Sequence, residues 1–258
     1  MEKIYLWNGR APYSDVSAGQ EQPSLTPFTV NGSKGALIVI PGGAYWIKAD
    51  HEGAPVAEYF RDAGISAFTL DYRVHPCDKM APLADANRAV RLVRSFGYEK
   101  VAVLGFSAGG NLCCSAAVHY DAGDPDSADP VERFSSRPDG FIPCYAVASL
   151  TKYTHIGSLR NLLGNECESV AWQRYFSAEE NVTDDTPPAF IWHTASDQSV
   201  PVENSLNLAS ALSAHGVSYE MHIFPAGAHG LGLAQNTEAA CEWPRLAAAW
   251  LLRGGYGV

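Results

Sequence analysis

Short apolar segments rich in β-branched and aromatic residues recur along the chain, and each is followed by a turn and a helical pattern. The segments that predict buried strands are residues 36–43, 65–73, 100–107, 141–147, 189–196 and 219–227. The helical patterns are residues 52–63, 81–96, 108–120, 202–215 and 237–253. This alternation predicts an α/β fold with a mostly parallel central sheet that helices bury on both faces.

Residues at the ends of the predicted helices agree with this pattern. Acidic side chains fall near three helix starts, where the helix dipole favours negative charge: Glu52, Asp85 and Glu203. Glycines follow three helix ends, where the left-handed backbone conformation is common: Gly64, Gly97 and Gly216. Before the first buried strand, we expect residues 4–7 and 25–30 to pair as an antiparallel edge of the sheet.

Two segments interrupt the regular alternation. Residues 121–140 are rich in Pro, Asp and Ser, which predicts a long exposed loop. Residues 149–187 lie between two predicted strands and hold one or two short helical patterns, so we expect an insertion that covers the strand ends as a small cap. No internal repeat or linker divides the sequence, which favours a single domain over residues 1–258.

The charge and hydropathy of the chain argue against two classes of partner, nucleic acids and membranes. The formal net charge is −10 and the 18 basic residues form no run, so we expect no nucleic-acid partner. No segment approaches the roughly 18 uninterrupted apolar residues of a membrane span, so we expect no membrane partner. The oligomeric state is not indicated by the sequence.

The cellular compartment is suggested by the first residues and the cysteines. Charge at Glu2 and Lys3 precedes only a short apolar run, which is not typical of a secretory signal. The cysteines form neither CxxC pairs nor a dense framework. We interpret them as reduced thiols of a cytoplasmic protein rather than as a nucleophile or zinc site: Cys77, Cys113, Cys114, Cys144, Cys167 and Cys241.

A candidate nucleophile follows the predicted strand that ends near residue 106. The pentad Gly-Phe-Ser-Ala-Gly at 105–109 matches the GxSxG nucleophile elbow, in which a tight turn from strand to helix exposes the serine. The five letters alone are a weak signal, but a buried strand before them and a helix after them make it specific. Ser107 is therefore the candidate nucleophile, and the alternative is a serine that caps the helix.

A serine hydroxyl needs a base that takes its proton during attack. Among eight histidines, His229 follows the last predicted strand in a glycine-rich loop before the C-terminal helix, as a base at the strand ends would. Others fall inside predicted strands or a helix, where a core or surface role is commoner, or lack such a placement: His119, His193, His222, His51, His75, His155 and His215. We predict His229 as the base.

The order of a nucleophile, an acid and a histidine along the chain requires an acid between Ser107 and His229. Asp197 directly follows the predicted strand before the last one, where its carboxylate can reach the imidazole. It could instead cap a helix, and Asp184 or Asp185 would replace it only if that strand is misplaced. The sequence predicts Asp197 as the residue that orients His229.

Acyl transfer places negative charge on the former carbonyl oxygen, and backbone N–H groups must stabilise it. One donor should be Ala108, which follows the nucleophile at the helix start. The others should come from residues 41–46, where Gly42 and Gly43 let the backbone turn its N–H groups inward. A plain turn at the end of a strand is the alternative.

These motifs together resemble one family over nearly the whole chain from about residue 30. The segments 39–74, 82–95, GFSAGG at 105–110, 191–205 and GAHG at 227–230 look like the esterase branch with feruloyl and acetyl xylan esterase members. That branch has the α/β-hydrolase fold and is related to the hormone-sensitive-lipase-like esterases. The resemblance implies that Gly43, Ala44 and Ala108 supply the oxyanion N–H groups.

Two positions depart from the lipase-like pattern. Pro41 stands where the lipase-like esterases usually have His, and Ala44 stands where a third Gly is usual. These differences weaken an assignment to the lipase-like group and leave the hydrolase assignment intact.

The leading hypothesis is a serine carboxylic ester hydrolase that acts on small acyl esters such as acetyl groups on sugars or xylo-oligosaccharides. Aromatic rings stack on sugar faces, so Tyr45, Trp46, Trp172 and Tyr175 are candidate substrate contacts, although the aromatic residues of the insertion could equally pack the cap. We expect no cofactor and no metal, because the sequence holds no metal-ligand spacing and no phosphate-binding glycine motif.

Two other functions remain open at this point. An amidase or peptidase of the same fold, such as an arylformamidase or a prolyl-oligopeptidase-like enzyme, uses the same chemistry. A binding protein without catalysis is disfavoured because Ser107, Asp197 and His229 are all present and in order.

Overall fold

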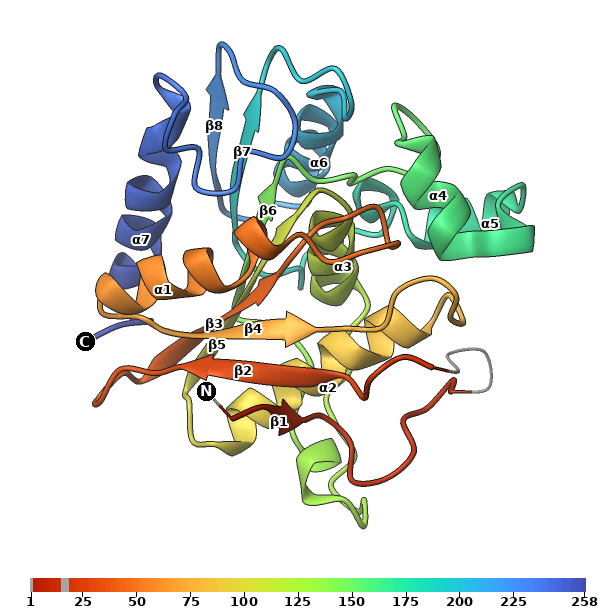
Figure 1. The fold of residues 1–258 in the computed structure, drawn as a ribbon, viewed down its shortest axis with the longest axis vertical. Helices are drawn as coiled ribbons and strands as arrows, with labels where there is room; N and C mark the ends of the chain where they lie inside the picture. The colour runs from red at the N-terminus through yellow and green to blue at the C-terminus, as the bar shows by residue number, and fades with distance from the viewer. Residues whose placement is uncertain (1, 15–18) are drawn as a thin grey trace.

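The computed structural model describes residues 2–14 and 19–258. Within these ranges, eight strands form one sheet in the order β1-β2-β4-β3-β5-β6-β7-β8 (Figure 1). The strands are β1 (Ile4–Tyr5), β2 (Ser24–Phe28), β3 (Gly35–Ile40), β4 (Ser66–Asp71), β5 (Lys100–Phe106), β6 (Gly140–Cys144), β7 (Ala189–Thr194) and β8 (Tyr219–Phe224).

Strands β3 to β8 are parallel to one another, whereas β1 and β2 form an antiparallel edge. Ile4 lies opposite Leu25, so the two segments that the sequence assigns to this edge do pair. Because the parallel strands run the same way, their carboxyl ends meet at one edge of the sheet. The predicted α/β fold is confirmed, and the loops that carry the candidate site all leave from that edge.

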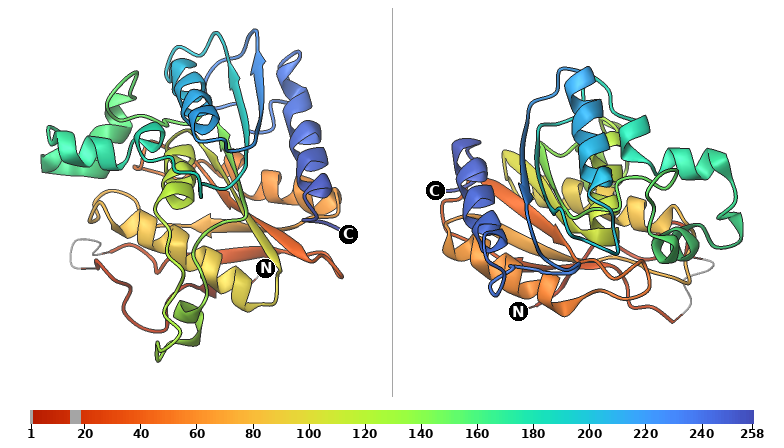
Figure 2. Two further views of the ribbon diagram at one scale, coloured as in Figure 1. Left: turned by 180° about the vertical axis from the view of Figure 1, so that it is seen from behind. Right: turned by 90° about the horizontal axis from the view of Figure 1, so that it is seen from above.

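Helices cover both faces of the sheet (Figure 2). The core on one face includes residues of α2 (Ala81–Ser95), α3 (Ser107–Val118) and α6 (Glu203–Ala214). The core on the other face includes residues of α1 (Ala54–Asp62) and α7 (Trp243–Arg253). Short 3-10 turns flank these helices at η1 (Asp50–Glu52), η2 (Pro130–Arg133) and η5 (Ala240–Glu242).

Successive side chains of a strand point to opposite faces, and β3 shows how this builds two cores. Ala36, Ile38 and Ile40 belong to the core beside α2 and α3. Leu37 and Val39 belong to the core beside α1 and α7. Since every residue of β3 is buried, the strand reads as a continuous apolar run in the sequence.

Two acidic residues do not have the role that their position near a helix start predicts. Glu52 precedes α1, and its buried side chain accepts hydrogen bonds from a backbone N–H and a tyrosine hydroxyl. Asp85 is the fifth residue of α2 and forms a buried ion pair with Arg73. Helix dipoles attract a charge only over the first turn, so tertiary partners override that pattern here. Glu203 does lie in the first turn of α6.

The two irregular segments differ in burial: most of the loop 121–140 is exposed or half-buried, as expected, and the insertion 149–187 contains short helices. The loop 121–140 contains η2 and is held against α2 by Arg88, which pairs with Asp129 at 2.7 Å and Glu132 at 2.6 Å. The insertion 149–187 contains α4 (Ile156–Leu163), η3 (Gly164–Glu166), α5 (Val170–Tyr175) and η4 (Ala178–Glu180). In Figure 1, α4 and α5 project together from the side of the molecule.

All six cysteines are free thiols, and burial raises the pKa of Cys113 and Cys114, which keeps both protonated.

Across residues 2–14 and 19–258, no helix combines the length and the apolar character that a bilayer crossing requires.

We predict that Asp85→Asn lowers the free energy of unfolding by about 3 kcal/mol, because Arg73 would keep a buried charge without its partner. The bond from Asp85 Oδ1 to Arg73 Nη2 is 2.7 Å long, and both side chains are nearly inaccessible. Urea unfolding measures the change. Glu99→Gln, which removes an exposed ion pair to Lys34, is the control and should leave stability unchanged. Equal stability of Asp85→Asn and wild type would contradict the assignment.

Candidate active site

The three residues selected by chain order lie within hydrogen-bond distance of one another. Ser107 begins α3 directly after β5, Asp197 follows β7 and His229 follows β8. Ser107 Oγ is 2.7 Å from His229 Nε2, and His229 Nδ1 is 2.7 Å from Asp197 Oδ2. A carboxylate only accepts hydrogen bonds, so Nδ1 carries the imidazole proton and Nε2 is left to accept from the serine hydroxyl. This arrangement suits proton transfer from Ser107.

Ser107 has the strained backbone of a nucleophile elbow. Its φ is +53°, in the left-handed region that side chains other than glycine rarely adopt. The turn brings two backbones together, because a Cβ on Gly105 would lie 2.1 Å from the carbonyl oxygen of Gly109. A Cβ on Gly109 would lie 2.4 Å from the carbonyl oxygen of Pro41. Both glycines of the pentad are therefore required by space.

Both carboxylate oxygens of Asp197 have polar contacts in addition to His229. Oδ1 accepts the N–H groups of Ser199 at 2.9 Å and Val200 at 3.0 Å, and Oδ2 lies 3.4 Å from His193 Nε2. Burial acts to raise the pKa of Asp197, but the hydrogen bonds from His193, His229 and Val200 outweigh it and hold the pKa well below its usual range. The charged form of Asp197 is thus favoured beside the imidazole.

The loop after β3 lies beside the start of α3 and has an unusual backbone. Three successive residues have positive φ: Gly43 at +127°, Ala44 at +56° and Tyr45 at +57°. The last two are not glycine, so each costs about 1–2 kcal/mol. Ala44 stands where the lipase-like relatives have glycine, and its conformation is one that glycine would adopt without this cost.

Side chains from distant segments hold this loop. Tyr72 donates to the Pro41 carbonyl at 2.8 Å, and Asn161 of α4 donates to the Ala44 carbonyl at 2.8 Å. The N–H of Gly42 donates to Glu52 Oε2 at 2.8 Å. In the part of the chain that the structure describes, no protein acceptor is recorded for the N–H groups of Gly43, Ala44 and Ala108. These N–H groups are available to a bound oxyanion.

The two neighbouring aromatic residues of the loop have different positions. Tyr45 is 1% exposed, and its hydroxyl donates to Asn111 Oδ1 at 2.8 Å, so its ring belongs to the core rather than to a substrate surface. Trp46 is 58% exposed and stacks on His75, with ring centroids 5.4 Å apart. The left-handed backbone between them turns one ring inward and the other outward. Only Trp46 has the exposure that an expected sugar contact needs.

The aromatic residues of the insertion are packed against their neighbours. Trp172 contacts Phe176, lies under Lys79 at 4.4 Å from the ring centroid, and donates to Glu166 at 3.0 Å. Tyr175 stacks on His119 with centroids 3.9 Å apart. Both rings are half-buried, and these contacts agree with the packing role that was the alternative for them.

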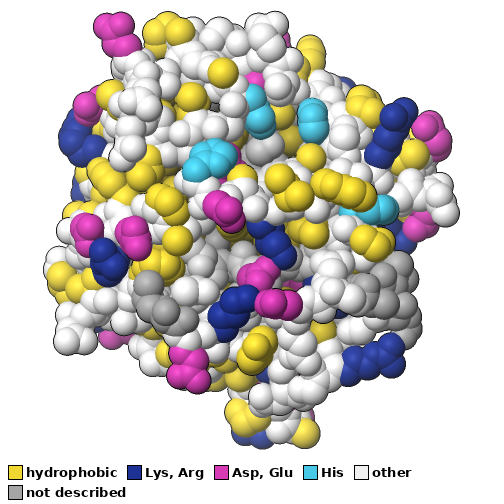
Figure 3. Space-filling model, in the orientation of Figure 1, with side chains coloured by type: hydrophobic (Ala, Val, Ile, Leu, Met, Phe, Trp, Pro, Cys, Tyr) yellow, Lys and Arg dark blue, Asp and Glu magenta, His cyan; other side chains and the backbone are white. Residues whose placement is uncertain are grey.

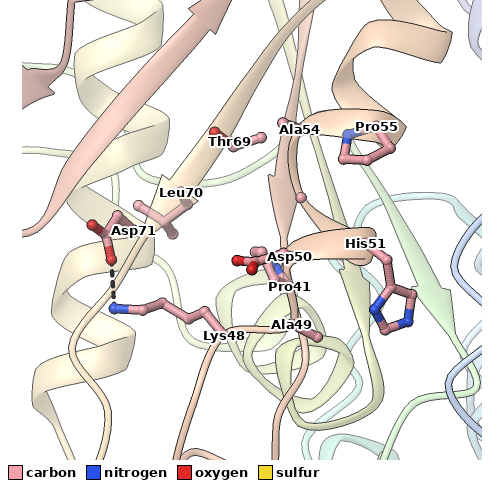
Figure 4. Close-up of a pocket in the computed structure, with 11 residues that line it drawn as sticks. Pro41, Lys48, Ala49, Asp50, His51, Ala54, Pro55, Thr69, Leu70 and Asp71 are labelled. Carbon is pink, nitrogen blue, oxygen red and sulfur yellow. Dashed lines mark ion pairs between the residues drawn. The ribbon is translucent and has the colours of Figure 1, made fainter.

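A groove of about 740 Å³ lies beside the loop after β3 (Figure 4). Its lining includes Pro41, Asp50 and the ion pair of Lys48 with Asp71, but none of the three triad residues. In Figure 4 the His51 ring turns away from that ion pair. Its Nε2 lies 3.0 Å from the carbonyl oxygen of Gly230, in the loop 226–234 that carries His229 and is called the histidine loop below. In Figure 3 the histidine side chains that are visible lie in the upper half of the view, among hydrophobic side chains that are spread over the whole face.

Several residues around the site were not identified from the sequence. His193 is a buried, hydrogen-bonded histidine, which agrees with the core or surface role expected for it, and in addition it contacts Asp197. Asn111 and Asn161 fix the loop after β3 from two different helices. No short-range pattern marks such residues, because each acts on a segment far away in the chain. Among the described residues, no group of three or more His, Cys, Asp or Glu is arranged to hold a metal ion.

The depressed pKa of Asp197 predicts a pH-dependent contribution to stability. A carboxyl group whose pKa is lower in the folded than in the unfolded chain stabilises the fold above its unfolded value of about 3.9, and this stabilisation is lost as the pH falls through the folded pKa. The loss of stability in Asp197→Asn should therefore be largest at pH 5–7 and shrink below about pH 4. Urea unfolding of both proteins at pH 7, 5 and 3 tests this, and a pH-independent difference would contradict it.

Comparison with known proteins identifies the family. The BD-FAE family model matches residues 26–212. The chain is 40% identical over 238 residues to endo-1,4-beta-xylanase B of Butyrivibrio fibrisolvens, covering 86% of this chain and 36% of the relative. It is 29% identical over 213 residues to an acetylxylan esterase of Xylanibacter ruminicola, covering 78% and 42%. The chain thus spans well under half of the length of these two relatives.

Solved structures agree with the sequence match. An acetyl ester-xyloside bifunctional hydrolase from Caldicellulosiruptor lactoaceticus superposes with a TM-score of 0.93 at 43% identity, covering 100% of this chain and 97% of that chain. The carboxylesterase Cest-2923 from Lactobacillus plantarum superposes with a TM-score of 0.74 at 25% identity, covering 100% and 98%. With the family model matched over residues 26–212, the chain belongs to the BD-FAE family and has the α/β-hydrolase fold.

Proposed function

We propose that the chain is a serine carboxylic ester hydrolase in which Ser107 is the nucleophile, His229 the base and Asp197 the residue that orients the base. The observation that carries the proposal is the pair of 2.7 Å hydrogen bonds that joins the three side chains. Esterases among its relatives support the same reaction class, including the acetylxylan esterase and the carboxylesterase.

Acylation follows from this geometry. Ser107 Oγ forms a bond to the carbonyl carbon of the ester while its proton passes to His229 Nε2. The carbonyl electrons move to oxygen, and the resulting oxyanion accepts hydrogen bonds from the N–H groups of Gly43, Ala44 and Ala108. The intermediate collapses, the bond to the alcohol oxygen breaks, and the proton on Nε2 goes to the leaving alcohol.

Deacylation repeats the steps with water. Nε2 of His229 takes a proton from the attacking water, the oxyanion forms again, and its collapse returns the proton to Ser107 Oγ with release of the acid. The nearby charge of Asp197 stabilises the imidazolium in both halves of the reaction. The lowered pKa of Asp197 keeps this contribution available at every pH at which the enzyme would work.

Acetylated sugars or xylo-oligosaccharides are the substrates we propose. Two relatives carry names that include acetylated xylan or xylosides, the acetylxylan esterase and the bifunctional hydrolase. Trp46 supports the proposal within this chain. It lies in the loop 41–46 after β3, called the oxyanion loop below, and an exposed indole there can stack on a sugar ring. The stacking of Trp46 on His75 holds the indole in place before a ligand binds.

We predict that Ser107→Ala abolishes ester hydrolysis and covalent labelling by a fluorophosphonate, because the labelled oxygen is removed. Turnover of a small acetate ester and intact-protein mass measure both effects. Ser95→Ala removes a hydroxyl that is bonded only within α2 and should behave as wild type. Labelling of the Ser107→Ala protein at Ser115 or Ser196 would overturn the assignment. Faster turnover of the matching amide than of the ester would favour the amidase alternative.

For Trp46→Ala we predict a KM about three- to tenfold higher for acetylated xylo-oligosaccharides and an unchanged KM for a small acetate ester. The small ester has no sugar that could stack on Trp46, so its KM shows whether the substitution changes anything other than sugar stacking. Tyr5→Ala removes an exposed aromatic ring from the edge strand β1 and is the matched control. A proportional change for both substrates would contradict a sugar platform at Trp46.

A further inference from the structure

Glu52 is a buried acid that the reaction steps above do not use. It is 2% exposed, and both carboxylate oxygens are occupied. Oε2 accepts the N–H of Gly42 at 2.8 Å, and Oε1 accepts the hydroxyl of Tyr145 at 2.6 Å. The His51 ring also lies near this carboxylate, with Nε2 3.8 Å from Oε1. A buried carboxylate is costly unless it is hydrogen-bonded or paired, and these two hydrogen bonds offset part of that cost.

Tyr145 extends this contact to the other side of the site. It is 1% exposed and follows β6, with a φ of +35°. Its hydroxyl oxygen accepts the N–H of Gly232 at 2.9 Å, three residues beyond His229. The edge of its ring also meets the His229 imidazole, with centroids 5.1 Å apart. One tyrosine therefore contacts the base directly and anchors the loop that carries it.

The resulting chain of hydrogen bonds joins the oxyanion loop to the histidine loop through Glu52 and Tyr145. We propose that Glu52 and Tyr145 are positioning residues that fix the distance between the oxyanion donors and the base. This inference rests on the proposed triad. In this proposal the buried pair of Glu52 and Tyr145 aligns two loops that are far apart in the sequence.

Both loops have backbone conformations that additional contacts help to fix. The oxyanion loop has positive φ at three successive residues. Gly42 lies so close to the nucleophile that a Cβ there would be 3.1 Å from Ser107 Cβ, so a small rotation of its peptide would move the donors relative to Ser107. The histidine loop contains Gly227, Gly230 and Gly232, all with positive φ, and glycine favours many other conformations.

The hydrogen bonds also indicate why a carboxylate is present. Both neighbours of Glu52 donate to it, and a carboxylate can accept from both at once. A glutamine has one acceptor oxygen, so it cannot accept from Gly42 and Tyr145 through two different oxygens. Glu52→Gln weakens the link with almost no change in volume, because its amide group would have to donate to a Tyr145 oxygen that already accepts from Gly232. Tyr145→Phe removes the same link from the other side and keeps the ring against His229.

The test measures kcat and KM for a small acetate ester with Glu52→Gln, Tyr145→Phe and the double variant, together with the thermal midpoint of each. We expect kcat to fall about 10- to 100-fold in each single variant, with KM within about twofold, because misplacement of about 1 Å costs on this order. The double variant should lose little more than either single variant, since both break one link. Tyr145→Phe also keeps the test open if Glu52→Gln does not fold.

Ser66→Ala is the matched structural control. Ser66 is fully buried and its hydroxyl accepts the Val30 N–H at 2.9 Å, but it begins β4 at the opposite end of the parallel strands from Ser107. This variant should lower the thermal midpoint and leave kcat unchanged.

Each outcome decides between the proposals. If Ser107→Ala is inactive while both Glu52→Gln and Tyr145→Phe keep the wild-type kcat, the positioning role is wrong and the triad stands. Losses of kcat that add in the double variant, or that equal the loss in Ser66→Ala at the same change in thermal midpoint, would also overturn the positioning role. An active Ser107→Ala overturns both proposals.

Discussion

The close approach of two backbones at the turn from β5 to α3 is the constraint on which the site depends. Gly105 and Gly109 leave so little space that any side chain there would overlap a carbonyl group. This contact forces Ser107 into the left-handed region and brings the start of α3 against the loop after β3. Ser107, the loop after β3 and the start of α3 are thereby brought together by one steric condition, and the other residues of the candidate site lie around it.

The sequence predicted the features that depend on short-range patterns and chain order. Buried parallel strands read as apolar runs, and the glycines at 105 and 109 have a steric cause that the pentad itself expresses. Asp197 and His229 could be selected because each follows a strand whose carboxyl end lies at the same edge as that of β5. The fold was thus predictable from the sequence, as was the proximity of Ser107, Asp197 and His229, whose catalytic roles stay predictions.

Features that depend on pairing between distant segments were not accessible. Asp85 and Glu52 fit the pattern of acids at helix starts, but Arg73 and Tyr145 determine what they do. Tyr45 and Trp46 are adjacent and chemically alike, and only the positive φ at Tyr45 explains why one ring enters the core. Sequence periodicity carries no information about such backbone reversals, because a single residue in the left-handed region breaks the period that side-chain direction otherwise follows.

The separation of the triad along the chain has a consequence for folding. Ser107 and His229 are 122 residues apart, and β6, β7 and β8 follow β5 in the sheet, so the proposed base reaches the proposed nucleophile only when all three strands have paired. Long-range parallel pairing of this kind is slow compared with helix formation. A chain that has formed its helices and the first parallel strands would hold a complete serine turn with no base. Recovery of covalent reactivity after dilution from denaturant therefore reports the docking of the last strand, later than the return of helical circular dichroism.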